Sequence, residues 1–135
     1  MTTPRPRRTP VAAYALAHLY NPNPHPEVIE YLERIQDTLD PFDGRFLVHG
    51  PTVTVAEGEW PGTLVIIEFP DAERAGAWYT SPAYQEILPL RTRNIEGAAI
   101  LAEGVGPDYH PSSKAQEMRA LAEAMPVGPQ AGGSE

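Results

Sequence analysis

The sequence contains no cysteine, and this absence excludes several kinds of protein. A chain without thiols forms no disulfides, holds no metal through thiolates and has no cysteine nucleophile. The absence fits the reducing cytoplasm, which is the location we expect. The sequence also lacks a run of about 18 apolar residues, the length that a membrane-spanning helix needs. Its N-terminal arginines are not followed by the apolar segment of a secretory signal, so we expect no membrane association.

Positive charge is scarce as well. The 135 residues include 10 Lys and Arg against 18 Asp and Glu, for a net charge of -8. Because nucleic acids bind to basic surfaces, we expect no nucleic-acid partner. The histidines do not show the spacing of a metal-binding motif, and no glycine-rich phosphate-binding loop is present. The sequence therefore predicts a protein without a metal ion or other cofactor.

The chain divides into three parts by composition. Residues 1–10 are rich in Pro, Thr and Arg, and we expect them to form a disordered tail. Residues 11–105 carry the periodic apolar patterns of a folded domain. Residues 106–135 form an extension in which 112–125 predict a short helix with a serine cap, followed by a flexible end.

Apolar periodicity in the central part predicts alternating strands and helices. The predicted strands are alternating or continuous apolar runs, at residues 11–20, 45–49, 52–56, 63–69 and 98–105. The predicted helices are 27–39, 71–79 and a segment that begins at Ser81-Pro82. The first helix carries a stripe of apolar residues, Val28, Ile29, Leu32, Ile35 and Leu39. This order predicts an α+β, ferredoxin-like split βαβ sandwich, in which helices cover one face of a four-stranded antiparallel sheet.

The predicted strand 63–69 is largely apolar on both faces. One face carries Val65, Ile67 and Phe69, and the other carries Leu64, Ile66 and Glu68. One face can pack against helices, whereas the other needs a further cover. Because this chain has no second sheet, we expect a homodimer that packs sheet on sheet.

Glu68 is the candidate for chemistry that this strand offers. A buried carboxylate costs several kcal/mol, on the order of 3–5, unless it is paired. Arg45 and His49, which we expect on one shared face of a neighbouring strand, could pair with it in a structural role. Alternatively, Glu68 lies in a cleft between sheet and helices as a general base, with Arg45 and His49 beside it. These three residues are the candidate catalytic residues.

Five further residues are candidates for ligand binding. His18 shares a strand face with Tyr14, and the two either line a cavity or belong to the core. Trp60 and Tyr84 are aromatic residues that contact a ligand or anchor the core or the dimer. Arg91 either clamps a carboxylate ligand or pairs with an acid on the surface.

Several ordered motifs resemble one protein family. They are G-R-F-L-V-H-G (44–50), E-G-E-W-P-G (57–62), V-I-I-E-F-P-D (65–71), A-W-Y-T-S-P-A-Y-Q (77–85), Arg91 and A-E-G-V (102–105). With them the chain resembles the domain of unknown function 1330 family, of the dimeric α/β-barrel superfamily. The resemblance covers roughly residues 12–105 and implies a ferredoxin-like protomer in a dimer whose sheets form a barrel. His49 stands where family members often carry an arginine.

The resemblance implies no settled reaction. The superfamily includes cofactor-independent monooxygenases, muconolactone-type isomerases and haem-binding enzymes, so the fold does not select a chemistry. Three classes of function stay open. The protein binds or transforms a small organic metabolite in a cleft between sheet and helices, it is a non-catalytic ligand-binding accessory module, or it is a purely structural dimer.

Overall fold

The structure is a computed structural model that describes residues 11–50 and 53–125. Contacts within the chain divide it into two units, Met1–Val105 and Gly106–Glu135. The disordered tail predicted for residues 1–10 and the flexible end predicted after residue 125 lie outside the described residues.

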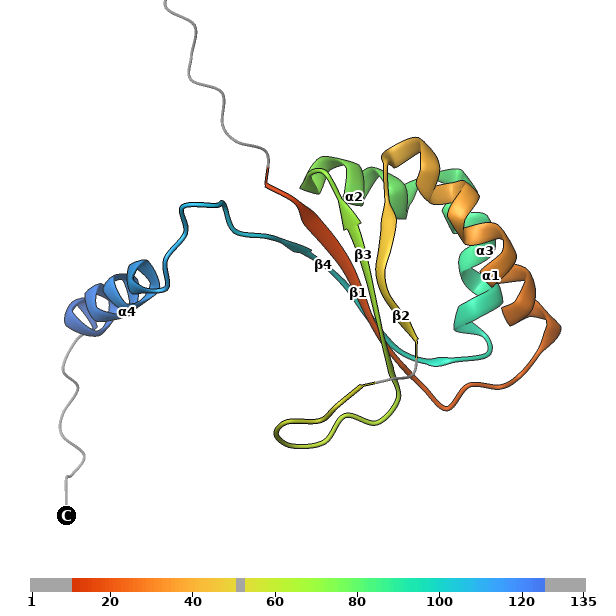
Figure 1. Cartoon of the computed structure of the whole chain (residues 1–135), viewed down its shortest axis with the longest axis horizontal. Helices are drawn as coiled ribbons and strands as arrows, with labels where there is room; N and C mark the ends of the chain where they lie inside the picture. Colours follow the sequence, from red (N-terminus) through yellow and green to blue (C-terminus); the bar gives the residue numbers. More distant parts are fainter. Residues whose placement is uncertain (1–10, 51–52, 126–135) are drawn as a thin grey trace, which may run out of the picture. The chain divides into compact units, whose positions relative to one another are not determined.

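A four-stranded antiparallel sheet forms the centre of the first unit, with the strand order β2-β3-β1-β4. Its strands are β1 (Ala13–Tyr20), β2 (Arg45–Gly50), β3 (Thr63–Phe69) and β4 (Glu96–Glu103). One face of the sheet is covered by α1 (Pro26–Leu39), α2 (Ala72–Thr80) and α3 (Pro82–Thr92), and a short 3-10 helix, η1 (Asp40–Phe42), follows α1 (Figure 1). The predicted ferredoxin-like α+β fold is confirmed.

Capping side chains explain where two of the helices begin. At the start of α2, Oδ1 of Asp71 accepts a hydrogen bond of 2.8 Å from the backbone N–H of Arg74. At the start of α3, Oγ of Ser81 accepts one of 3.3 Å from the backbone N–H of Tyr84. Pro82 lies in the first turn of α3, where a backbone N–H has no helical partner. Both caps agree with the sequence prediction.

The hydrophobic core lies between the helices and the sheet. Phe69 and Leu39 are fully buried in it. Trp78 is buried as well, and its Nε1 donates a 2.9 Å hydrogen bond to Oγ1 of Thr38. Gly44 is required by this packing, because a Cβ there would lie 2.7 Å from the Phe69 ring and 2.8 Å from Leu39.

A β-bulge interrupts β2 and decides which face each of its side chains occupies. Arg45 pairs with Glu68 and Phe46 pairs with Ile67, but the next pair is Val48 with Ile66. Leu47 is therefore an extra residue in this strand. Beyond it, every side chain of β2 lies on the face opposite to the one that simple alternation assigns.

The sequence prediction fails in two places within the first unit. Residues 53–56 form no strand. The preceding strand β2 already reaches Leu64, near the start of β3, through Gly50, and β3 pairs with β1 on its other side. In α1, Ile29 is 59% exposed and Leu32 is 48% exposed, although the apolar stripe was expected to include both. The buried stripe of α1 instead consists of Tyr31, Ile35, Thr38 and Leu39.

The second unit contains one helix, α4 (Ser112–Ala124), within the described residues. The helix was predicted, but the expected cap by Ser112 or Ser113 is wrong. The residue before the helix is Pro111, and the backbone N–H of Ser112 donates to Nδ1 of His110 at 3.1 Å. In residues 11–50 and 53–125, no helix is both long and apolar enough to cross a membrane.

Candidate functional site

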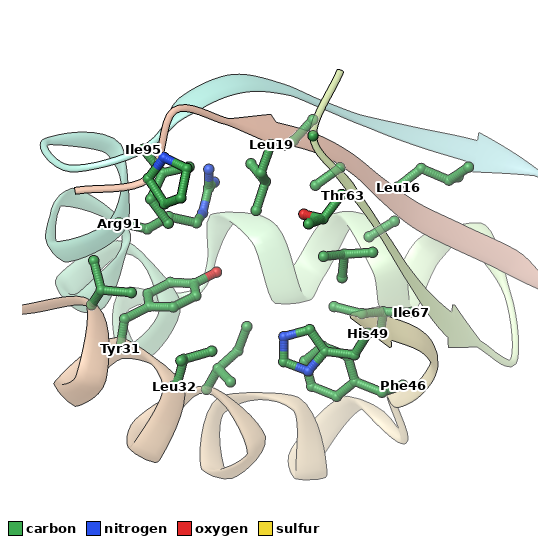
Figure 2. A pocket seen from close by; sticks show the side chains of 18 of the residues that line it. Leu16, Leu19, Tyr31, Leu32, Phe46, His49, Thr63, Ile67, Arg91 and Ile95 are labelled. Carbon is green, nitrogen blue, oxygen red and sulfur yellow. The ribbon is translucent and has the colours of Figure 1, made fainter. Parts of the chain in front are cut away.

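A cavity of about 640 Å³ lies between the helices and the sheet (Figure 2). Residues from all four strands and from α1, α2 and α3 line it, and most of them are apolar. The cavity exists partly because β1 carries small side chains on this face. Ala15 and Ala17 line it where larger residues would fill the space, and Ala99 does the same on β4 opposite Ala17.

Three polar side chains gather on one side of the cavity. The hydroxyls of Tyr31 and Tyr84 form a hydrogen bond of 2.7 Å. The guanidinium carbon of Arg91 lies 5.7 Å from the centre of the Tyr31 ring, a distance typical of a cation–π contact. Arg91 is only 8% exposed, yet it lines the cavity. Tyr31 and Tyr84 are both buried.

This burial shifts the pKa values of two of these groups, Tyr31 and Arg91. Burial raises the pKa of Tyr31, and the neighbouring Tyr84 raises it further, so Tyr31 stays a neutral phenol that can donate a hydrogen bond. Burial lowers the pKa of Arg91, but Tyr31 and Tyr84 outweigh this effect and the net shift is upward. The cavity therefore contains a fixed positive charge.

His49 and Phe46 lie across the cavity from Arg91 and Tyr31 (Figure 2). Their rings are stacked, with centroids 4.5 Å apart and an angle of 15° between the planes. Phe46 precedes the bulge and pairs with Ile67, whereas the bulge at Leu47 brings His49 to the same face, opposite Val65. An imidazole can give or take a proton near neutral pH, so His49 is the cavity residue best suited to acid–base chemistry.

Glu68 lies on the opposite face of the sheet, and the expectation that it shares a cleft with His49 is corrected. Its Oε1 accepts a hydrogen bond of 2.9 Å from Nε of Arg45, and Nη2 of Arg45 lies 2.8 Å from the same oxygen as an ion pair. The hydroxyl of Tyr14 is 3.4 Å from the other carboxylate oxygen. The first interpretation, an ion pair with Arg45, is the one that the geometry supports. The bulge separates Arg45 from His49, which were expected on one face.

His18 and Trp60 also lie away from the cavity. Their rings are 4.3 Å apart, and Nε2 of His18 contacts the carbonyl oxygen of Pro61. His18 alternates with the cavity-lining Ala17, so it shares the outer face of β1 with Tyr14. The structure thus divides the sequence candidates into two groups. Tyr84, Arg91 and His49 line the cavity, whereas five others do not: Tyr14, His18, Arg45, Trp60 and Glu68.

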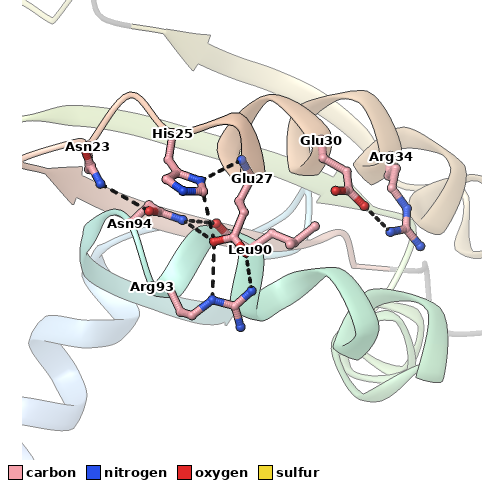
Figure 3. A network of polar contacts seen from close by, with 8 residues as sticks. All are labelled: Asn23, His25, Glu27, Glu30, Arg34, Leu90, Arg93 and Asn94. Carbon is pink, nitrogen blue, oxygen red and sulfur yellow. Dashed lines mark hydrogen bonds and ion pairs between the residues drawn. The ribbon is translucent and has the colours of Figure 1, made fainter.

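A polar network joins the start of α1 to the end of α3 (Figure 3). Glu27 accepts hydrogen bonds from Arg93 at 2.7 Å and from Asn94 at 3.0 Å. The hydrogen bond from Arg93, and to a lesser extent that from Asn94, lowers the pKa of Glu27 to about 2. The backbone N–H of Asn23 donates to the carbonyl of Asn94 at 2.8 Å. The network therefore holds the segment after β1, which includes the cavity-lining Pro22, against the end of α3.

The sequence reasoning did not identify Tyr31 and Phe46 as site residues. Tyr31 stands three residues after Val28 and four before Ile35, so helical periodicity places it on the inward stripe. Phe46 lies within the quoted G-R-F-L-V-H-G motif, but its pairing with His49 depends on the bulge. Tyr31 could therefore have been found from the sequence, whereas the stacking of Phe46 on His49 could not.

Comparisons with known proteins agree with this architecture. The family model for Domain of unknown function (DUF1330) matches residues 12–105. A protein of unknown function from Rhodopseudomonas palustris has 16% identity and a TM-score of 0.54 over 75% of this chain and 86% of its own. A dimeric ferredoxin-like protein of unknown function from Jannaschia sp. CCS1 has 15% identity and a TM-score of 0.52, over 70% and 99%. A search of curated protein sequences found no significant match.

Proposed function

Because the chain belongs to the family of Domain of unknown function (DUF1330), whose description names no activity, we propose a function from the cavity itself. The protein binds a small, largely apolar organic molecule between its sheet and its helices. The observation that carries this proposal is the cavity of about 640 Å³ in a domain whose core is otherwise closely packed. Ligand sites typically measure about 300–1,000 Å³ and combine apolar walls with a few polar groups.

The lining of the cavity supports binding over a purely structural role. Unfilled apolar space lowers stability, by about 24 cal/mol for each Å³ in engineered cavities. A structural dimer would gain by replacing Ala15 or Ala17 with a larger residue. A bound ligand would explain both features, because it would fill the apolar space and form hydrogen bonds with the polar groups that face it.

A homodimer is part of the proposal. On the outer face of the sheet, Ile66 pairs with Leu16 on β1 and with Val48 on β2. Ile100, which pairs with Leu16, is 58% exposed, and Leu16 and Ile100 are also among the residues that line the cavity. An apolar sheet face of this kind favours packing against a second copy. The dimeric relative from Jannaschia sp. CCS1 is consistent with such an assembly.

Catalysis at the same site is the second candidate, and His49 is the observation that favours it. An imidazole stacked on Phe46 at the cavity wall has a defined orientation, as a general acid or base requires. A binding module needs no such group. The His49→Gln variant distinguishes the two, because it abolishes turnover of a bound compound in an enzyme, whereas a binding module shows no turnover with either residue.

The test of binding uses naphthalene-2-carboxamide, a neutral and mostly apolar probe. Trp78 lines the cavity, so its fluorescence reports an occupant, and isothermal titration calorimetry gives the stoichiometry. We expect saturable binding at one site per chain. Absence of saturable binding by this probe and by its carboxylate analogue would contradict the proposal.

A further inference from the structure

Arg91 differs from the other arginines of the described domain in having no acidic partner. Arg34, Arg45, Arg74 and Arg93 each lie within 4.0 Å of at least one carboxylate. All four are surface residues whose side chains are between 41% and 71% exposed. Arg91 is the buried one, and no described carboxylate lies within ion-pair distance of its guanidinium.

A buried and unpaired guanidinium is costly. Removing a cation from water is strongly unfavourable unless an opposite charge accompanies it. The Tyr31 ring offsets a part of this cost through the cation–π contact, which is weaker than an ion pair. No Asp or Glu lines the cavity to supply the rest. The missing negative charge is therefore expected to come from outside the chain.

The two phenols beside Arg91 leave a hydrogen-bond donor available. Each hydroxyl has one hydrogen, and the hydrogen bond between Tyr31 and Tyr84 uses one of the two. The second hydrogen is free to donate to an acceptor in the cavity. A guanidinium beside a phenol with a hydrogen to donate suits a carboxylate, which accepts through two oxygens.

We propose that Arg91, with Tyr31 and Tyr84, binds the carboxylate of an apolar monocarboxylic acid. This inference rests on the proposed binding function of the cavity and names the class of its ligand. The carboxylate lies at the Arg91 side, and the apolar body extends toward Phe46 and His49 across the cavity (Figure 2).

The rest of the lining argues for a single acid group on the ligand. Arg91 is the one arginine among the lining residues, and none of them is a lysine. A second carboxylate would be buried without a cation to pair with it, at a cost that apolar contacts do not offset. The wall near the other end consists of Phe46, Val65, Ile67 and Leu32, which suit an aromatic or alicyclic body.

The experiment compares naphthalene-2-carboxylate with naphthalene-2-carboxamide, which has the same shape and no charge. Both are titrated into the full-length protein at pH 7 by isothermal titration calorimetry. We expect the carboxylate to bind at least about tenfold more tightly than the amide, since one charge-assisted contact corresponds to about that factor. The Arg91→Met variant should lose this preference while its affinity for the amide stays within about threefold.

Three further variants make the result specific. Arg74→Met removes an exposed, paired arginine outside the cavity and should leave both affinities unchanged. Arg91→Lys keeps the charge and should keep part of the preference for the carboxylate over the amide. This variant tests the inference even if Arg91→Met folds poorly. Tyr31→Phe should weaken the carboxylate alone, by about threefold to tenfold.

The outcomes separate the inference from the proposed function. If the amide binds wild-type protein as tightly as the carboxylate, or if Arg91→Met keeps the preference, the inference is overturned and the binding function stands. If neither probe binds, the proposed function is overturned and the inference with it.

Discussion

Filling the cavity should make the protein more stable and less able to bind. Ala17 lines the cavity from β1, and the Ala17→Leu substitution adds three carbon atoms to the space of about 640 Å³. Burying each carbon stabilises by about 0.8 kcal/mol, or about 2.4 kcal/mol for three. Ordering the longer side chain costs about 0.5–1 kcal/mol. We therefore expect a net gain of about 1.5 kcal/mol.

Urea denaturation, followed by the fluorescence of the buried Trp78 and by circular dichroism, measures this gain. The Ala77→Leu variant is the matched control, because Ala77 is an exposed residue of α2 outside the cavity. It should change the free energy of unfolding by less than about 0.5 kcal/mol. Ala17→Leu should also weaken binding of naphthalene-2-carboxamide at least about tenfold. Destabilisation by more than about 1 kcal/mol would show that neighbouring side chains already occupy the space, which would refute the reasoning.

Three other predictions concern the surfaces around the cavity. The folded-state pKa of Glu27 is about 2, below its ordinary value of 4.5, so its contribution to stability is complete above about pH 4.5 and disappears as the pH falls toward 2. Urea denaturation should therefore show that the free energies of unfolding of the wild type and of Glu27→Gln converge as the pH falls from 4.5 toward 2. A difference between the two free energies that does not change with pH would contradict the assignment. Glu68→Gln should cost less than about 1 kcal/mol, because Arg45 is 71% exposed, and should leave calorimetric titrations of the cavity unchanged; loss of probe binding would mean that the outer face communicates with the cavity. Ile66→Asp should convert the proposed dimer to a monomer in light scattering, whereas a dimer that persists would place the interface elsewhere.

The sheet and its helices were predictable because local patterns determine them. The residues of β3 alternate between two faces, and the Asp71 and Ser81 caps have clear signatures. The fold follows from the order of these elements, since short connections leave few ways to arrange them. The absence of a strand at 53–56 was not predictable from that segment. It depends on whether a partner strand has free backbone groups, which is a property of the whole sheet.

The candidate site was predictable only in part. The residue types were right for Tyr84, Arg91 and His49, which line the cavity. The separation of His49 from Glu68 depends on the extra residue in β2, because bulges reflect hydrogen bonding between strands and have no strong signature within one strand. The isolation of Arg91 from any carboxylate is also a tertiary property. In the sequence, Glu86 and Glu96 both stand five residues from Arg91, and neither pairs with it.

The bulge at Leu47 also affects how sequences related to this one should be aligned. A chain with one residue fewer at this point would place the residue that aligns with His49 on the outer face of the sheet, although its identity had not changed. Gain or loss of the cavity imidazole can therefore occur by a single insertion or deletion of one codon. Column-by-column comparison of residue types would not detect such an event. Alignments of β2 need the length of the strand as well as its composition before a histidine in it is assigned to either face.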